Sequence, residues 1–186
     1  MKKILLFSAC VVLAFASCKK DSAKKTASTS ITATIDGSNM NFSTGATAQS
    51  ISEGGIYSLQ IIGDYGSGTS AQGIVVAIET DKPIVKGTYS TTDTSSIIDV
   101  TYVQNTSTSN PVSFSTVDVG SITITSISGT NVQGTFSGTL VSDQDNTTTK
   151  TVTNGKFNVG VVAGSVQVNN SRLEAKMQAF KNRVRN

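Results

Sequence analysis

The sequence has no histidine and no tryptophan, and only two of its 186 residues are cysteine. Without histidine, the chain lacks the commonest general base and the commonest ligand of transition metals. Catalytic arrangements that pair histidine with serine or cysteine are therefore excluded. Proline also occurs only twice, and charged residues make up 15% of the chain. These absences exclude several classes of enzyme, and they do not select a function.

Serine and threonine are abundant, with 26 of each. The apolar fraction of 37% is low but sufficient for one core, and the length fits a single domain of roughly 100–200 residues. The net charge of +3 is unevenly distributed, because residues 1–25 carry +5, residues 171–186 carry +4 and the stretch between them carries −6. We therefore expect an acidic domain with a basic segment at each end, and no nucleic-acid partner.

The first 18 residues have the pattern of a bacterial lipoprotein signal. Two lysines precede an apolar run, Ile4–Ala16, which fits a signal-peptide core and is shorter than the ~20 residues of a membrane-spanning helix. Small residues then lead to Cys18, as in a lipobox, where cleavage precedes a cysteine that carries lipid. We expect a signal peptide over residues 1–17 and lipid attachment, palmitate included, at Cys18. The alternative is an ordinary secretory signal in which Cys18 is coincidental.

Residues 18–29 are polar, without an apolar period, and are expected to be a flexible tether between lipid and domain. Cys10 would leave with the signal peptide, and Cys18 would be joined to lipid through its sulfur. The mature chain then has no free thiol, which excludes disulfides, thiol catalysis and cysteine metal sites. The expected partner at this end is the membrane, reached through the N-terminal lipid.

Residues 30–168 alternate apolar and polar side chains with a period of two, which is typical of β-strands. Asp36-Gly37 between two such runs predicts a hairpin turn. The continuous apolar run Gly73–Ile78 is typical of a strand covered on both faces. Further runs with strand character lie at Ile97–Val103, Val112–Val119, Ser121–Ile127, Val132–Val141 and Lys150–Val159. The expected fold is all-β: an antiparallel β-sandwich or small barrel of eight to ten strands.

One amphipathic helix is predicted at the C-terminus, over residues 171–185. Ser171 and Glu174 form a capping box, and Leu173, Met177, Phe180 and Val184 follow one helical face. Five basic residues surround that stripe. A helix of this length is marginal alone, so it must dock on something. The β domain, an anionic or membrane surface and a partner chain are the three alternatives.

Several acids could in principle support paired-carboxylate glycoside hydrolysis: Glu53, Asp64, Glu79, Asp81, Asp93, Asp99 and Asp118. Most lie in turns or at polar strand positions, so we expect no catalytic residue, no cofactor and no enzyme activity. Asp143, Asp145 and Asn146 offer oxygen ligands for Ca²⁺ but lack the glycine and distant glutamate of an EF-hand loop, so a hairpin turn is the better interpretation.

Sugar binding is the most reasonable ligand hypothesis, and it needs exposed aromatic rings on which sugar faces can stack. Only four tyrosines are available besides the phenylalanines. Tyr65, in a glycine-rich stretch, is the one expected to be exposed and to contact a ligand.

Several short phrases resemble, in their order, the small all-β lipoproteins of Bacteroidota that carry a domain of unknown function. They are Ile31–Gly37, Lys86–Tyr89, Ser121–Thr125, Gly134–Leu140 and Val152–Val159. The resemblance covers about residues 30–160 and implies an outer-membrane location, with the periplasmic or surface orientation open. Asp21-Ser22-Ala23 also resembles the O-glycosylation acceptor of that phylum, which implies a modification site at Ser22.

Taken together, the sequence predicts a lipid-anchored envelope lipoprotein without enzymatic activity, located at the cell outer membrane. Two alternatives remain for its role. It is a binding module for a glycan or peptide, or it is a structural or assembly protein that contacts a partner through its C-terminal helix.

Overall fold

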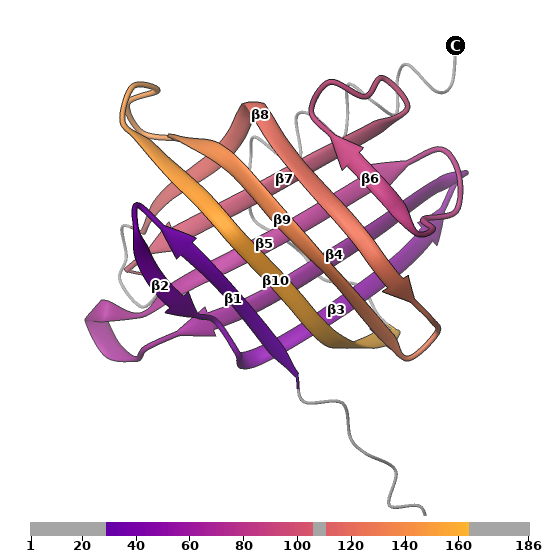
Figure 1. Cartoon of the computed structure of the whole chain (residues 1–186), viewed down its shortest axis with the longest axis horizontal. Helices are drawn as coiled ribbons and strands as arrows, with labels where there is room; N and C mark the ends of the chain where they lie inside the picture. Colours follow the sequence, from indigo (N-terminus) through magenta and orange to yellow (C-terminus); the bar gives the residue numbers. More distant parts are fainter. Residues whose placement is uncertain (1–28, 106–110, 164–186) are drawn as a thin grey trace, which may run out of the picture.

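The computed structural model describes residues 29–105 and 111–163, and within them the protein is all-β (Figure 1). The strands are β1 (Ser30–Ile35), β2 (Ser38–Asn41), β3 (Thr44–Glu53), β4 (Ile56–Tyr65), β5 (Gln72–Thr80), β6 (Gly87–Ser90), β7 (Ser96–Gln104), β8 (Val112–Ile127), β9 (Asn131–Ser142) and β10 (Thr149–Ala163). A single 3-10 turn, Gly68–Ser70, is the helical element of the described residues. The all-β class is therefore confirmed, while the predicted helix at 171–185 lies outside them.

The strands form one sheet that closes on itself. Starting at β3, the neighbours are β4, β5, β7, β8, β9 and β10, and β10 then pairs with β3. The closing pairs, Val161 with Ala48, Val162 with Gln49 and Ala163 with Ser50, are parallel. The expectation of a purely antiparallel fold was therefore wrong: the sheet is mixed, because its last strand returns beside β3 in the same direction.

The sheet is folded into two crossing layers (Figure 1). We call β1, β9, β10 and the second half of β8 the front layer, and β3, β4, β5 and β7 the back layer. The hairpin β1–β2 extends the front layer beyond β10, and β6 extends it beyond β8. Both layers direct one set of alternate side chains toward each other, which is how a two-layer β fold encloses its core.

The core consists of these alternate side chains. In β1, Ile31, Ala33 and Ile35 are buried, as the alternation predicts. In β5, Ile74, Val76 and Ile78 belong to the same hydrophobic core. Phe136 of β9 and Phe157 of β10 stack with ring centroids 6.3 Å apart. Burying aliphatic and aromatic side chains of this size is the main favourable contribution to folding.

Local sequence features explain the first hairpin and the longest strand. Asp36 and Gly37 have φ values of 48° and 81°, which confirms the predicted turn with two left-handed positions. The two runs expected over Val112–Val119 and Ser121–Ile127 are instead one strand, β8. Its ladder to β9 shifts register between Thr116 and Gly120, so the two runs are separated by an irregularity within one strand.

Candidate functional site

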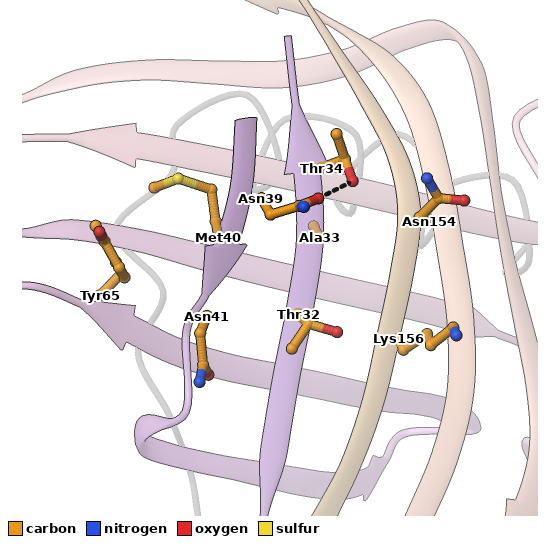
Figure 2. Close-up of a pocket in the computed structure, with 9 residues that line it drawn as sticks. All are labelled: Thr32, Ala33, Thr34, Asn39, Met40, Asn41, Tyr65, Asn154 and Lys156. Carbon is orange, nitrogen blue, oxygen red and sulfur yellow. Dashed lines mark hydrogen bonds between the residues drawn. The ribbon is translucent and has the colours of Figure 1, made fainter. Parts of the chain in front are cut away.

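A hollow of about 450 Å³ lies along the β1–β2 hairpin and is the best candidate site for a ligand (Figure 2). We call it the hairpin groove. It is lined by hydroxyl, amide, thioether, ammonium and phenol side chains from four strands: Thr32, Ala33, Thr34, Asn39, Met40, Asn41, Tyr65, Asn154 and Lys156. Figure 2 shows that the lining extends from Tyr65, past β2 and β1, to Lys156 on β10.

The turn at Asp36-Gly37 sets the register that positions the polar groups of the hairpin. Thr32 is opposite Asn41, and Thr34 is opposite Asn39. The Thr34 hydroxyl donates to Asn39 Oδ1 at 2.9 Å. Asn41 Oδ1 accepts hydrogen bonds from the backbone N–H and the hydroxyl of Ser43. Both amide oxygens are thus engaged inside the hairpin, which fixes the side chains and leaves their NH₂ groups as the donors toward a ligand.

A β-bulge in β10 supplies the other side of the groove. Between Val152 and Gly155, β10 has one residue more than the segment of β9 that it pairs with. The pairing of β10 with β1 shifts by one residue at the same place, next to Thr153. Asn154 stands in the bulge with φ of 53°. A left-handed conformation is tolerated by asparagine and uncommon for other non-glycine residues. Bulges re-aim side chains, and this one adds the Asn154 amide to the groove beside the Lys156 ammonium.

Tyr65 is where the sequence predicts an exposed aromatic ring: its side chain is 39% exposed and lines the groove. Its ring packs edge-on against Phe42, with centroids 6.2 Å apart, and Phe42 is fully buried. The backbone of β4 approaches the Phe42 backbone closely because Gly63 has no side chain. A Cβ at Gly63 would lie 2.0 Å from the Phe42 carbonyl oxygen. Tyr65 thus packs against a buried ring, and part of its own side chain is exposed to solvent.

Hydrogen-bond donors dominate the chemistry of the groove. Three carboxamides, the Thr32 hydroxyl and the Lys156 ammonium line it, from β1, β2 and β10. Its lining contains no carboxylate, so no acid–base pair is present in it. A site of this kind can hold a molecule rich in oxygen acceptors next to an aromatic ring.

A second, smaller hollow of about 230 Å³ lies at the turn end of the hairpin and includes Asp36, Lys150, Gln72 and Tyr102. Lys150 Nζ lies 2.8 Å from Asp36 Oδ2, and this hydrogen-bonded ion pair holds the pKa of Asp36 below its usual value. The Tyr102 hydroxyl donates to Gln72 Oε1, and burial raises the pKa of Tyr102. These polar groups bond to one another, so we assign this hollow a structural role.

The acids that could have supported catalysis are distributed over separate parts of the fold, apart from Glu79 and Asp99, which lie at diagonal positions on β5 and β7. Asp93 accepts hydrogen bonds from the Ser95 backbone and hydroxyl, which lower its pKa. Partial burial raises the pKa of Asp64. Glu53 and Asp81 are exposed at strand ends, whereas Glu79 and Asp99 are buried in the back layer. The Asp118 side chain lies outside the described set.

The acidic turn after β9 contains Asp143, Asp145 and Asn146. The Asp145 carboxylate accepts from the Thr148 hydroxyl at 2.6 Å and from the backbone N–H groups of Thr147 and Thr148, both at 2.8 Å, and these bonds lower its pKa. Asp143 Oδ2 instead accepts from the Ser113 hydroxyl at 2.6 Å. Within residues 29–105 and 111–163, no cluster of three acidic, histidine or cysteine side chains is suited to a metal ion. The calcium site stays a prediction that this geometry does not favour.

Several predicted features lie outside the described residues, namely Cys18, Ser22 and the helix at 171–185. Among the residues that are described, no helix is long and apolar enough to cross a membrane.

Sequence reasoning found Tyr65 and missed the rest of the groove. The omitted residues are polar positions of β1, β2 and β10, which look like ordinary solvent-facing strand residues. One local signal was available, because Asn154-Gly155 interrupts an otherwise alternating run and such a glycine suggests a bulge. Comparisons of this chain with protein-family models, with curated proteins and with solved structures find no match.

Proposed function

We propose that this protein is a lipid-anchored, non-enzymatic component of the bacterial outer membrane whose β domain holds a glycan in the hairpin groove. The continuous ladder from β3 round to β10 favours describing the domain as a flattened barrel. The proposal combines the lipoprotein pattern at the N-terminus with the chemistry of the groove. The likeness of its short phrases to Bacteroidota lipoproteins is consistent with this location.

One observation carries the binding proposal: an aromatic ring and a set of oriented donors face the same hollow. Tyr65 offers a partly exposed ring, and sugar rings stack on aromatic faces through their apolar C–H groups. The amides of Asn39, Asn41 and Asn154 can donate in pairs to neighbouring hydroxyl oxygens. Because β-strands hold these side chains, little conformational entropy is lost when a ligand binds.

A non-catalytic role is supported by what the groove offers. Its lining has no carboxylate, and the sequence provides neither histidine nor, after lipidation of Cys18, a thiol. Asp36, Asp93 and Asp145 are engaged in turn-stabilising hydrogen bonds with nearby residues. Carboxylates used in this way maintain the fold and are not arranged as an acid–base pair.

A glycan array with the purified lipidated protein tests the binding proposal. We expect binding that falls about tenfold or more in Tyr65→Ala and is retained in Tyr65→Phe, because the phenylalanine keeps the ring. Lys156→Gln should also weaken binding, whereas Lys82→Gln removes the same charge at an exposed position outside the groove. A flat array for the wild type, or equal binding by Tyr65→Ala, contradicts the proposal.

The anchor is tested separately by growing cells with radioactive palmitate. The wild-type chain should be labelled, and Cys18→Ala should not. An unlabelled wild type, or a labelled Cys18→Ala, would contradict lipid attachment. Intact-mass analysis of the same preparation tests the proposed glycosylation, since Ser22→Ala should lose the added sugar mass if Ser22 is the acceptor.

A peptide is the second candidate ligand, and the position of β2 favours it. β2 is the terminal strand of the sheet path and has β1 as its one ladder partner among the described strands. An edge strand can accept an extended peptide as an additional strand. Binding of this kind depends on backbone groups, so it should survive Tyr65→Ala and be abolished by a proline in β2, at Asn39 or Asn41.

A further inference from the structure

The outer face of the back layer is buried, although outer faces normally meet solvent. Ala77, Glu79 and Asp99 point away from the core, because they alternate with the core residues Val76, Ile78, Ile98 and Val100. Their exposed fractions are nevertheless only 2%, 2% and 1%. Ser58 and Gln60 of β4, on the same face, are buried as well.

The front layer offers the control for this comparison. Its outward residues include Thr135, Thr151 and Lys156, and all three are exposed. The front layer lies on the core side of the back layer (Figure 1), so it cannot cover the opposite face. Among the described strands, none is stacked on the outer face of β3, β4, β5 and β7. The described strands therefore do not account for the burial of this face.

Two neighbouring rows across the back layer define this face. One row is Gln49, Gln60, Ala77 and Asp99, and the next is Ile51, Ser58, Glu79 and Ile97. We call these eight residues the covered face: five of them are buried, and Gln49, Ile51 and Ile97 are half-buried. It combines apolar side chains with two buried carboxylates at diagonal positions on adjacent strands, a spacing of about 7–8 Å between Cα atoms. Asp99 accepts hydrogen bonds from the Thr101 and Thr116 hydroxyls. Nearby cations stabilise buried carboxylates further, because burial of a negative charge is unfavourable.

We propose that residues 171–186 dock on the covered face as the amphipathic helix that their sequence predicts. Their apolar stripe, Leu173, Met177, Phe180 and Val184, matches the apolar part of this face, which includes Ala77 and Ile97. Their net charge of +4 complements Glu79 and Asp99. The docked helix forms a third layer. The covered face in turn gives this short helix the packing contact that it needs to be stable.

The chain leaves the described fold at the right place for this docking. Ala163, the last residue of β10, pairs with Ser50 of β3, which lies between Gln49 and Ile51 at one end of the two rows. Twenty-three residues follow Ala163. The seven before Ser171 can span up to about 25 Å when extended, and crossing the back layer from β3 to β7 takes about 15 Å. Distance therefore permits the helix to cover the whole face.

Thiol labelling of the lipidated full-length chain tests the proposal. Ala77→Cys places a nearly isosteric thiol on the covered face, and Thr135→Cys places one on the exposed front layer. Ala77→Cys should react with a maleimide at least about tenfold more slowly than Thr135→Cys, since a covered thiol reacts only during local opening. Deleting residues 171–186 should remove this difference, and mass spectrometry of the peptides identifies the labelled site.

A second measurement keeps the test decisive if the truncated chain fails to fold, which circular dichroism would show. In the full-length chain, replacing the five basic residues of 171–186 by glutamine should lower the melting temperature. That effect should shrink markedly in a Glu79→Gln background and persist in Glu53→Gln, which removes an equal charge from an exposed position. Additive effects in both backgrounds would overturn the proposal. Rapid labelling of Ala77→Cys in the full-length chain, or protection that survives truncation in a folded chain, would overturn it too, and would direct attention to a partner protein or membrane surface.

Discussion

Lys150 Nζ lies 2.8 Å from Asp36 Oδ2, which joins the first residues of β10 to the turn between β1 and β2, 114 positions earlier in the chain. The other carboxylate oxygen of Asp36 accepts the Thr151 backbone N–H at 2.9 Å. The same ammonium lies 5.3 Å from the centroid of the Phe114 ring. One turn residue thereby fixes the hairpin that forms the groove to the strand that carries Asn154 and Lys156.

This ion pair predicts a specific pH dependence. The pKa of Asp36 is lowered in the folded state, first by its hydrogen bond to Lys150, so the pair stabilises the fold above the unfolded-state value near 3.8. That stabilisation should be lost as pH falls through the lower folded-state pKa. Because the Asp36 side chain is 45% exposed, we expect Lys150→Gln to cost only about 0.5 kcal/mol at pH 7. Thermal unfolding at pH 7 and pH 2 checks this, with Lys82→Gln as control, and an equal effect of Lys150→Gln at both pH values would contradict it.

The left-handed conformation of Asn154 predicts an unusual order of substitutions. Asn154→Val should lower the free energy of unfolding by about 1–2 kcal/mol, because a β-branched residue is disfavoured at a φ of 53°. Asn154→Gly should be close to neutral. Chemical denaturation of both variants measures the difference. If valine were tolerated as well as glycine, the bulge would not hold Asn154 in this conformation.

The close approach of Phe42 to Gly63 predicts that a single methyl group disrupts this part of the fold. Gly63→Ala would place Cβ 2.0 Å from the Phe42 carbonyl oxygen, so β4 and the residue that follows β2 must separate. We expect a loss of roughly 1–3 kcal/mol or more. Gly129→Ala is the matched control, because an added Cβ there meets no atom within 4 Å. Comparing the denaturation midpoints of the two variants tests the prediction, which fails if they are equal.

Phe42 connects core packing to ligand binding. Its ring lies 6.2 Å from both Tyr65 and Tyr102, edge-on in each case. Phe42→Leu should cost roughly 1–2 kcal/mol, less than the roughly 3–5 kcal/mol of truncation to alanine. Because the substitution removes the ring that packs against Tyr65, glycan affinity should also fall, although Phe42 does not line the groove. Phe136→Leu, a core change elsewhere, should reduce stability without reducing affinity.

Regular patterns in the sequence predicted the elements whose local signals agree with the tertiary structure. The alternation in β1, the Asp36-Gly37 turn and the continuous apolar run in β5 each determine a local conformation, and each is observed. β3 and β6 were not predicted as strands, because β3 contains few large apolar residues and β6 has only four residues. Their conformation is fixed by neighbouring strands, and pattern reading does not detect that contribution.

The candidate site was harder to predict than the fold because it depends on register. Tyr65 could be singled out by its glycine-rich surroundings. The partners of Tyr65 are brought together by the pairing of Thr32 with Asn41 and by a bulge that shifts β10 by one residue. A one-residue change of register moves every side chain of a strand to the opposite face. Composition carries no information about such a shift until the pairing is known.

The parallel pairing of β10 with β3 has a consequence for how the chain folds. β1 emerges first during synthesis, yet its ladder partner β10 is the last strand of the described fold, as the pair Ser30 with Asn158 shows. The ring therefore cannot close until nearly the whole domain is available, and contacts of such long sequence separation slow folding. A chain interrupted anywhere before residue 149 would leave β1, β3 and β9 without a common neighbour. Closure of the ring thus awaits the final strand of the described fold.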